Sequence, residues 1–146
     1  MNIQTKFLGE VDIQEQSIIT FPEGIPGFQE EKQFVLIPLN DVSPFRVLQS
    51  IHTKKVGFMV ATPYAFKKEY AFDLQQSDVE KLEIERAEDV LVYGILTLKD
   101  TLLQSTINLL APIVINEKKQ LAKQIVLPSE EDLLHFPLKS VEGSGK

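Results

Sequence analysis

Short apolar segments, many of them rich in β-branched residues, recur along the whole chain and are separated by Gly, Pro, Asn and Asp. This alternation is typical of β-strands joined by turns. It predicts strands at residues 3–8, 11–13, 17–21, 33–38, 46–50, 57–62, 90–99, 106–110, 113–116 and 120–127. Many of these segments recur every 8 to 14 residues or so, a spacing that favours a sandwich or a barrel. The expected fold is all-β, mainly antiparallel and barrel-like.

Helical signals are few. Ser77 and Glu80 have the spacing of a capping box, which predicts a short helix over residues 78–82. Ser129, followed by three acidic residues, predicts a second short helix that includes Leu133. Neither helix is long enough to connect the strands of a parallel α/β fold. The segment 90–98 is apolar on both faces, which predicts a central strand covered on both sides, or alternatively a strand with one face exposed for docking.

The size and composition indicate one globular domain. Residues 1–138 of the 146 are expected to form it, with 139–146 as a disordered tail. The chain has no cysteine, no apolar run of membrane-spanning length and no apolar stretch near the N-terminus typical of a secretory signal. These features favour the cytoplasm.

The chain is acidic, with a net charge of −6 and a pI near 5.0. This balance disfavours direct binding to nucleic acid and favours a basic protein partner. Acidic residues concentrate between 69 and 89, where only Lys81 and Arg86 oppose Glu69, Asp73, Asp78, Glu80, Glu83, Glu85, Glu88 and Asp89. We expect much of this stretch to be solvated, and we take Glu83, Glu85 and Glu88 as candidate partner-binding residues. The alternative is a surface that only keeps the protein soluble.

Residues for catalysis or metal binding are sparse. Only His52 and His135 could serve a catalytic triad. Ser50 lies two residues from His52, which is next to a predicted turn. No His, Asp and Glu cluster has the spacing of metal ligands. The acidic stretch lacks the apolar surroundings that tune a catalytic carboxyl. The prediction is a protein that is not an enzyme and needs no cofactor or metal.

The segment 24–28, Gly-Ile-Pro-Gly-Phe, is the most unusual stretch. Pro26 and Gly27 suit the two central positions of a type II turn. Either this corner tucks Ile25 and Phe28 under the barrel, or it presents these two apolar side chains to a partner. Both residues are therefore candidate binding residues.

Several short motifs occur together in one order. They are Gly24 to Phe28, Pro44-Phe45 with Leu48-Gln49-Ser50, Thr62-Pro63 with Tyr70, Thr106 to Leu109, Ala111-Pro112-Ile113, and Ile115-Asn116. In order, spacing and total length the chain resembles the FliW family of bacterial flagellar assembly factors over about residues 2–127. The resemblance implies a small antiparallel β-barrel that is a monomer when free.

The same resemblance implies a function. Members of this family bind flagellin in the cytoplasm, and they also bind CsrA, a basic dimeric RNA-binding protein that represses translation of flagellin mRNA. Export of flagellin frees the assembly factor to capture CsrA, so that translation resumes. The acidic surplus of the chain agrees with a partner of this kind. The alternatives are a small-ligand-binding or enzymatic β-barrel, and an RNA-binding barrel, which the charge disfavours.

Overall fold

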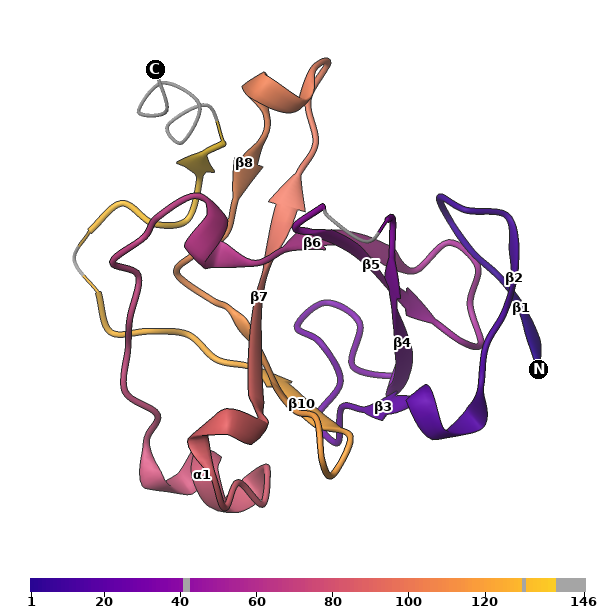
Figure 1. Cartoon of the computed structure of the whole chain (residues 1–146), viewed down its shortest axis with the longest axis horizontal. Coiled ribbons are helices and arrows are strands. Elements are labelled where there is room, and N and C mark those ends of the chain that lie inside the picture. The colour runs from indigo at the N-terminus through magenta and orange to yellow at the C-terminus, as the bar shows by residue number, and fades with distance from the viewer. Residues whose placement is uncertain (41–42, 130, 139–146) are drawn as a thin grey trace.

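The computed structural model describes residues 1–40, 43–129 and 131–138. Seven strands close into a barrel (Figure 1), in the order β7, β6, β5, β4, β3, β10, β9 and back to β7. They are β3 (Ile19–Thr20), β4 (Gln33–Pro38), β5 (Phe45–Ser50), β6 (Gly57–Ala61), β7 (Val90–Thr97), β9 (Ile113–Asn116) and β10 (Leu121–Gln124). Neighbours are antiparallel except β3 and β10, which are parallel at Thr20 and Leu121. The prediction of a mainly antiparallel, barrel-like all-β fold is confirmed.

The remaining elements lie outside the ring. β1 (Asn2–Gln4) and β2 (Glu10–Asp12) form a separate hairpin, and β8 (Thr106–Ile107) and β11 (Phe136–Pro137) extend the sheet beyond the end of β7 (Figure 1). The single α-helix of the described residues is α1 (Gln76–Lys81). The described residues also contain four 3₁₀ turns, at η1 (Glu15–Ser17), η2 (Pro63–Ala65), η3 (Ala87–Asp89) and η4 (Leu102–Gln104).

Several of the predicted strands are shorter than expected, and in two of them a side chain bends the backbone at the end of the strand. Thr5 ends β1, since its hydroxyl donates to the carbonyl oxygen of Gly9 at 2.7 Å and closes a turn. Asn108 ends β8 in the same way, since its Oδ1 accepts the N–H groups of Leu110 and Ala111 at 3.1 and 3.0 Å. Asn and Thr side chains compete with strand pairing through such local bonds.

Both helix predictions need correction. α1 begins at Gln76, with Gln75 at the N-cap and no side-chain cap bond, so Ser77 lies inside the first turn and the capping box is not formed. At the second predicted helix, the Ser129 hydroxyl accepts the N–H of Glu131 at 3.1 Å, and residues 131–138 contain no helix. Glu130 and the predicted tail 139–146 lie outside the described residues. No helix within the described ranges is long and apolar enough to cross a membrane.

β7 separates two hydrophobic clusters, as its two-sided apolar sequence predicts. Tyr93, with Leu91 and Ile95, packs in the cluster that contains Phe21 and Phe34. Leu96, with Val90 and Val92, packs in the cluster that contains Tyr70, Leu82 and Leu109. Because successive side chains of a strand point to opposite faces, one strand serves both clusters.

Candidate protein-binding site

The motif residues of the sequence have structural roles that hold the barrel and its loops. Gln49 is fully buried, and its side chain accepts the N–H of Lys6 at 2.9 Å while it donates to carbonyl oxygens of the turn between β5 and β6, including that of Val56. The Tyr70 hydroxyl donates to the carbonyl oxygen of Leu109 at 2.7 Å, and burial raises the pKa of Tyr70 above its usual value. These side chains anchor the N-terminal hairpin and the long β6–β7 connection to the barrel.

The corner at residues 24–28 has the predicted conformation. The Phe28 N–H donates to the carbonyl oxygen of Ile25 at 2.6 Å, and Gly27 has a φ of +87°, as the third residue of a type II turn requires. Ile25 is only 2% exposed, so its side chain is not available to a partner. Phe28 is 40% exposed, and its ring packs edge-on against that of Phe58. Of the two candidates, only Phe28 presents apolar surface.

We expect Gly27→Val to lower the free energy of unfolding by about 1–3 kcal/mol, because a β-branched residue is strained at positive φ. No atom lies within 4 Å of a Cβ built at Gly27, so the Cβ itself meets no clash and the penalty comes from backbone strain. Chemical denaturation measures it. An unchanged midpoint would show that valine is tolerated in this turn.

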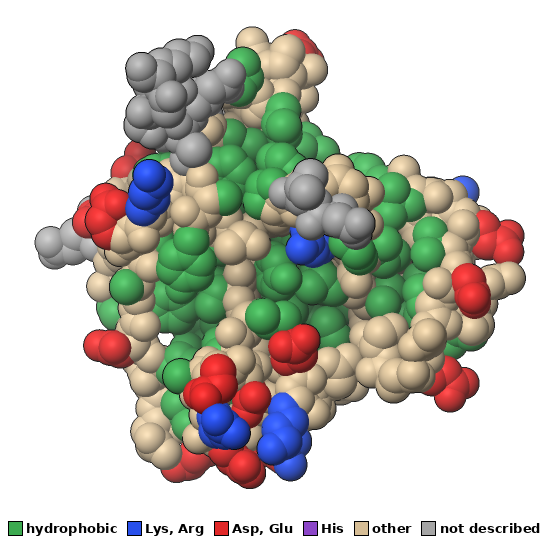
Figure 2. All heavy atoms as spheres, viewed as in Figure 1, with side chains coloured by type: hydrophobic (Ala, Val, Ile, Leu, Met, Phe, Trp, Pro, Cys, Tyr) green, Lys and Arg blue, Asp and Glu red, His purple; other side chains and the backbone are tan. Residues whose placement is uncertain are grey.

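The acidic segment is largely exposed, as predicted. Glu83, Glu85 and Glu88 are exposed, and Figure 2 shows Asp and Glu side chains gathered with a few Lys and Arg at the α1 end of the molecule. The Arg86 guanidinium donates to the Glu88 carboxylate at 2.7 Å. The backbone N–H of Glu88 and this guanidinium lower the pKa of the Glu88 carboxyl, so it is ionised at neutral pH.

Asp78 is the buried acidic residue in this otherwise largely solvated stretch. It is 5% exposed, and its carboxylate accepts a hydrogen bond from the Lys123 ammonium at 2.7 Å. That bond raises the pKa of Lys123. A buried carboxylate requires such a partner. Asp78 therefore fixes α1 to β10 and contributes no charge to the exposed face.

A Schellman motif sets the position of Glu83 and Glu85. The Glu83 N–H donates to the carbonyl oxygen of Glu80 and the Ile84 N–H to that of Val79, at 3.1 and 3.0 Å. Glu83 has a φ of +54°, in the left-handed region where this motif usually places glycine. A residue with a side chain therefore occupies a position where glycine would be less strained.

We expect Glu83→Gly to leave the stability unchanged or to raise it by up to about 1 kcal/mol, since relief of left-handed strain offsets the greater freedom of glycine in the unfolded chain. Thermal denaturation of the unaltered protein and of the Glu83→Gly variant measures the difference in stability. A loss of more than about 1 kcal/mol would show that the Glu83 side chain stabilises the fold.

A first hollow, the α1 groove, lies beside this segment and has a volume of ≈ 520 Å³. Its apolar lining includes Leu74, Val79, Ile84, Val90 and Val92. Its charged lining is Asp73, Glu85 and Arg86. Val90 and Val92 belong to β7, so one face of the central strand is partly open, as the alternative interpretation of its sequence allows. Apolar surface with charged residues around it is the usual composition of a protein interface.

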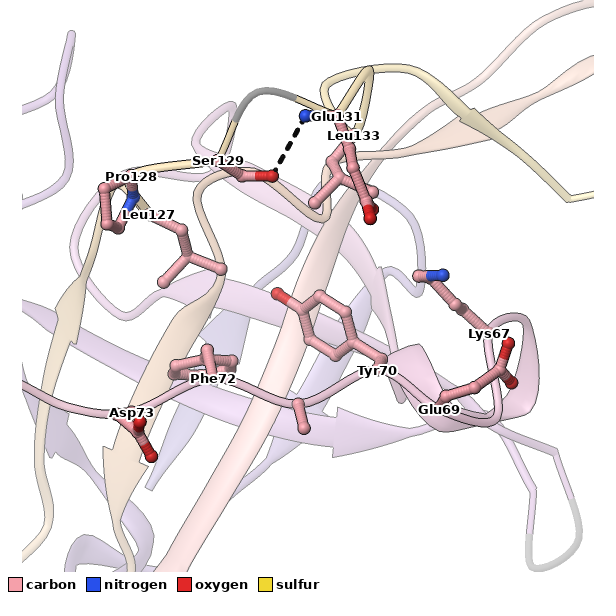
Figure 3. A pocket seen from close by; sticks show the side chains of 11 residues that line it. Lys67, Glu69, Tyr70, Phe72, Asp73, Leu127, Pro128, Ser129, Glu131 and Leu133 are labelled. Atoms are coloured by element: carbon pink, nitrogen blue, oxygen red, sulfur yellow. Dashed lines mark hydrogen bonds between the residues drawn. The ribbon is translucent and has the colours of Figure 1, made fainter.

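A second hollow, the Tyr70 groove, has a volume of ≈ 570 Å³ (Figure 3). Tyr70, Phe72, Leu127 and Leu133 give it apolar surface. Lys67 and Glu69 lie at one end and Asp73 at the other, as Figure 3 shows. Phe72 and Asp73 line both grooves, so the two hollows lie on either side of the same short segment.

The enzymatic alternative gains no support from the Ser50 region. The Ser50 hydroxyl is buried and donates to the Glu31 carboxylate at 2.6 Å. The His52 ring is bonded to the side chain of Gln33 at 3.0 Å, so it is not placed to take the proton of Ser50. Triad chemistry needs that direct bond. Among the described residues, no group of three His, Asp or Glu side chains could hold a metal ion.

The grooves could not be identified from the sequence, because their linings come from segments far apart in the chain. The alternating pattern of residues 70–75, with Tyr70, Phe72 and Leu74 apolar and Asp73 and Gln75 polar, was a signal that could have pointed there. No strand was predicted at these residues, and they have no strand partner within the described ranges.

Comparison with known proteins identifies the family. The family profile described as FliW protein matches residues 2–138. The flagellar assembly factors FliW of Bacillus licheniformis and Bacillus subtilis are each 50% identical over 138 residues, which cover 94% of this chain and 96% of theirs. The factor of Shouchella clausii is 38% identical over the full length of both chains. A crystal structure of the flagellar assembly factor FliW superposes with a TM-score of 0.88 at 42% identity, covering 94% of this chain and 96% of that one. This chain belongs to the FliW family of flagellar assembly factors.

Proposed function

We propose that the protein is a non-catalytic, cytoplasmic regulator of flagellar assembly that binds flagellin and CsrA in turn. In this cycle, flagellin occupies the protein while unexported flagellin accumulates. Export frees the protein, which then binds CsrA and relieves repression of flagellin mRNA. The membership of the chain in a family of flagellar assembly factors carries this proposal.

The exposed acidic segment supports the basic partner. Glu83, Glu85 and Glu88 lie next to the apolar α1 groove, so one face offers negative charge and apolar contact together. A field of this sign raises the association rate of a basic protein. The same negative field repels phosphate, so this protein, once bound to CsrA, would lower the affinity of CsrA for RNA.

The direct test is isothermal titration of the purified protein with flagellin and with CsrA from the same organism. We expect each to bind, and we expect added flagellin to reduce the binding of CsrA. In a gel-shift assay with the flagellin mRNA leader, this protein should release the RNA from CsrA. Flagellin added afterwards should allow CsrA to bind the RNA again. Failure of both partners to bind would refute the proposal.

We expect the triple variant Glu83→Lys, Glu85→Lys, Glu88→Lys to keep its fold and to bind CsrA with an association rate constant lowered by up to about tenfold. The reason is that reversed charges remove electrostatic steering. Association of the unaltered protein should also slow as salt is raised. Stopped-flow or biosensor kinetics measure both rates.

The matched control carries the same change in net charge elsewhere. Glu10, Glu15 and Glu30 are exposed and lie outside the acidic segment and both grooves. Their reversal to lysine should slow association much less. Equal slowing by both triple variants would show that only the net charge matters, and unchanged kinetics in the first would assign the segment to solubility alone.

A further inference from the structure

Residues 71–75 form an extended segment that belongs to no sheet. Exposure alternates along it, with Ala71, Asp73 and Gln75 exposed and Phe72 and Leu74 half-buried. This period of two is that of a strand with one face on the protein and one in solvent. In Figure 1 the segment is part of the long connection from β6 to α1, which runs beside the barrel.

The backbone of this segment has free hydrogen-bonding groups. In the described part of the chain, the N–H and C=O groups of residues 71–74 make no hydrogen bond. The flanking residues, in contrast, are fixed. The Tyr70 N–H donates to the carbonyl oxygen of Lys67, and the carbonyl oxygen of Gln75 accepts the N–H groups of Asp78 and Val79 at the start of α1. The segment is therefore a strand held at both ends that lacks a neighbouring strand.

Space for a neighbouring strand exists at the sides of the segment. The Tyr70 groove lies between it and residues 127–129 with Glu131 and Leu133, and the α1 groove lies between it and the residues from Ile84 to Val92. Five extended residues span about 17 Å, enough for two or three ladder bonds along one edge. Each groove adds apolar surface for the side chains of an added strand.

We propose that residues 71–75 are the docking edge for an extended segment of a basic protein partner, which adds to them as a strand and places side chains in a flanking groove. Strand addition of this kind gains affinity from main-chain bonds and specificity from side-chain pockets. The inference rests on the proposed function in one respect, namely that the basic partner described above binds this protein.

The charges of the grooves favour a basic segment over a second copy of this chain. Four carboxylates line the two grooves against two cations: Glu69, Asp73, Glu85 and Glu131 against Lys67 and Arg86. Asp73 lies at the centre of the segment, so antiparallel pairing of two copies about this residue would bring like charges together. Like charges opposite one another destabilise a strand pair, and charged residues are a usual protection of exposed edges.

The test is amide hydrogen exchange, resolved by residue with NMR, of the full-length protein alone and saturated with CsrA. Binding is established separately by titration. The amides of residues 71–75 should exchange fast in the free protein, and in the complex one alternating set, either 71, 73 and 75 or 72 and 74, should be protected at least tenfold. A saturated complex in which these amides stay unprotected would refute the docking edge and leave the proposed function intact. If CsrA does not bind at all, the docking edge and the proposed capture of CsrA are both refuted.

A proline variant tests the main-chain bonds themselves. Proline goes into the protected set, as Asp73→Pro or Leu74→Pro, and the alanine variant at the same position is the control that keeps the N–H. The proline variant should bind CsrA at least tenfold more weakly than its alanine control, with unchanged circular dichroism. Equal affinities would overturn the proposal. So would protection that appears without partner as the protein concentration rises, because the occupant would then be a second copy.

Discussion

Replacement of Gly24 by alanine should lower the free energy of unfolding by about 2–5 kcal/mol, because two penalties act together. Gly24 has a φ of +69°, which strains any residue with a Cβ. A Cβ built there would lie 2.6 Å from the Cα and the carbonyl oxygen of Gln29. These are backbone atoms, so relief requires the loop from Gly24 to Gln29 to move. Denaturant unfolding of the two proteins measures the difference.

Gly9 is the matched control for this prediction. It has a φ of +72°, but no atom lies within 4 Å of a Cβ built there. Gly9→Ala therefore carries the backbone strain alone and should cost about 1–2 kcal/mol. If the two alanine variants were equally stable, the close approach of Gln29 would have no energetic consequence.

Replacement of Asn116 by alanine should lower the free energy of unfolding by about 2–4 kcal/mol, because it leaves buried polar groups without partners. Asn116 is 1% exposed at the end of β9. Its Nδ2 donates to the carbonyl oxygens of Leu82 and Glu83 at 2.8 and 3.1 Å, and its Oδ1 accepts the N–H groups of Lys118 and Lys119. The residue connects the β9–β10 turn to the end of α1.

Because Asn116 holds the carbonyl oxygen of Glu83, its loss should also loosen the acidic segment. We expect Asn116→Ala to speed amide exchange at residues 83–89 in addition to lowering the unfolding midpoint. Asn108→Ala is the matched control: Asn108 is half-buried and its Oδ1 accepts two backbone N–H groups, which belong to Leu110 and Ala111 and not to α1. It should cost about 1 kcal/mol and leave the exchange at 83–89 unchanged. Faster exchange there in both variants would contradict the role of Asn116.

Local chemistry explains the features that the sequence predicted well. The strands β4 and β9 have the predicted bounds, because β-branched and aromatic residues suit a pleated surface. The turn at Ile25–Phe28 follows from the fixed φ of Pro26 and the positive φ open to Gly27. The exposure of Glu83, Glu85 and Glu88 follows from the cost of burying unpaired carboxylates.

The start of α1 shows where local chemistry is insufficient. Ser77 and Glu80 have the spacing of a capping box, yet the helix begins one residue before Ser77. Asp78, on the same turn, is drawn to Lys123, which is 45 residues away along the chain. The buried Asp78 carboxylate and the partly exposed Lys123 ammonium join this turn to β10, a contact that the local capping pattern does not contain.

The sequence by itself determined the β-strand content, the type II turn and an acidic segment, because each depends on residues that are neighbours along the chain. Only the tertiary structure decided that β7 pairs with β9 to close the barrel, that Asp78 is buried and Glu83 is not, and that residues 71–75 lie between two grooves without a strand partner. These features depend on which distant segments meet. Contacts of that kind are fixed by the packing of the whole chain. The pattern of residues in a strand specifies that its backbone will pair with another strand, but it does not specify which strand that will be.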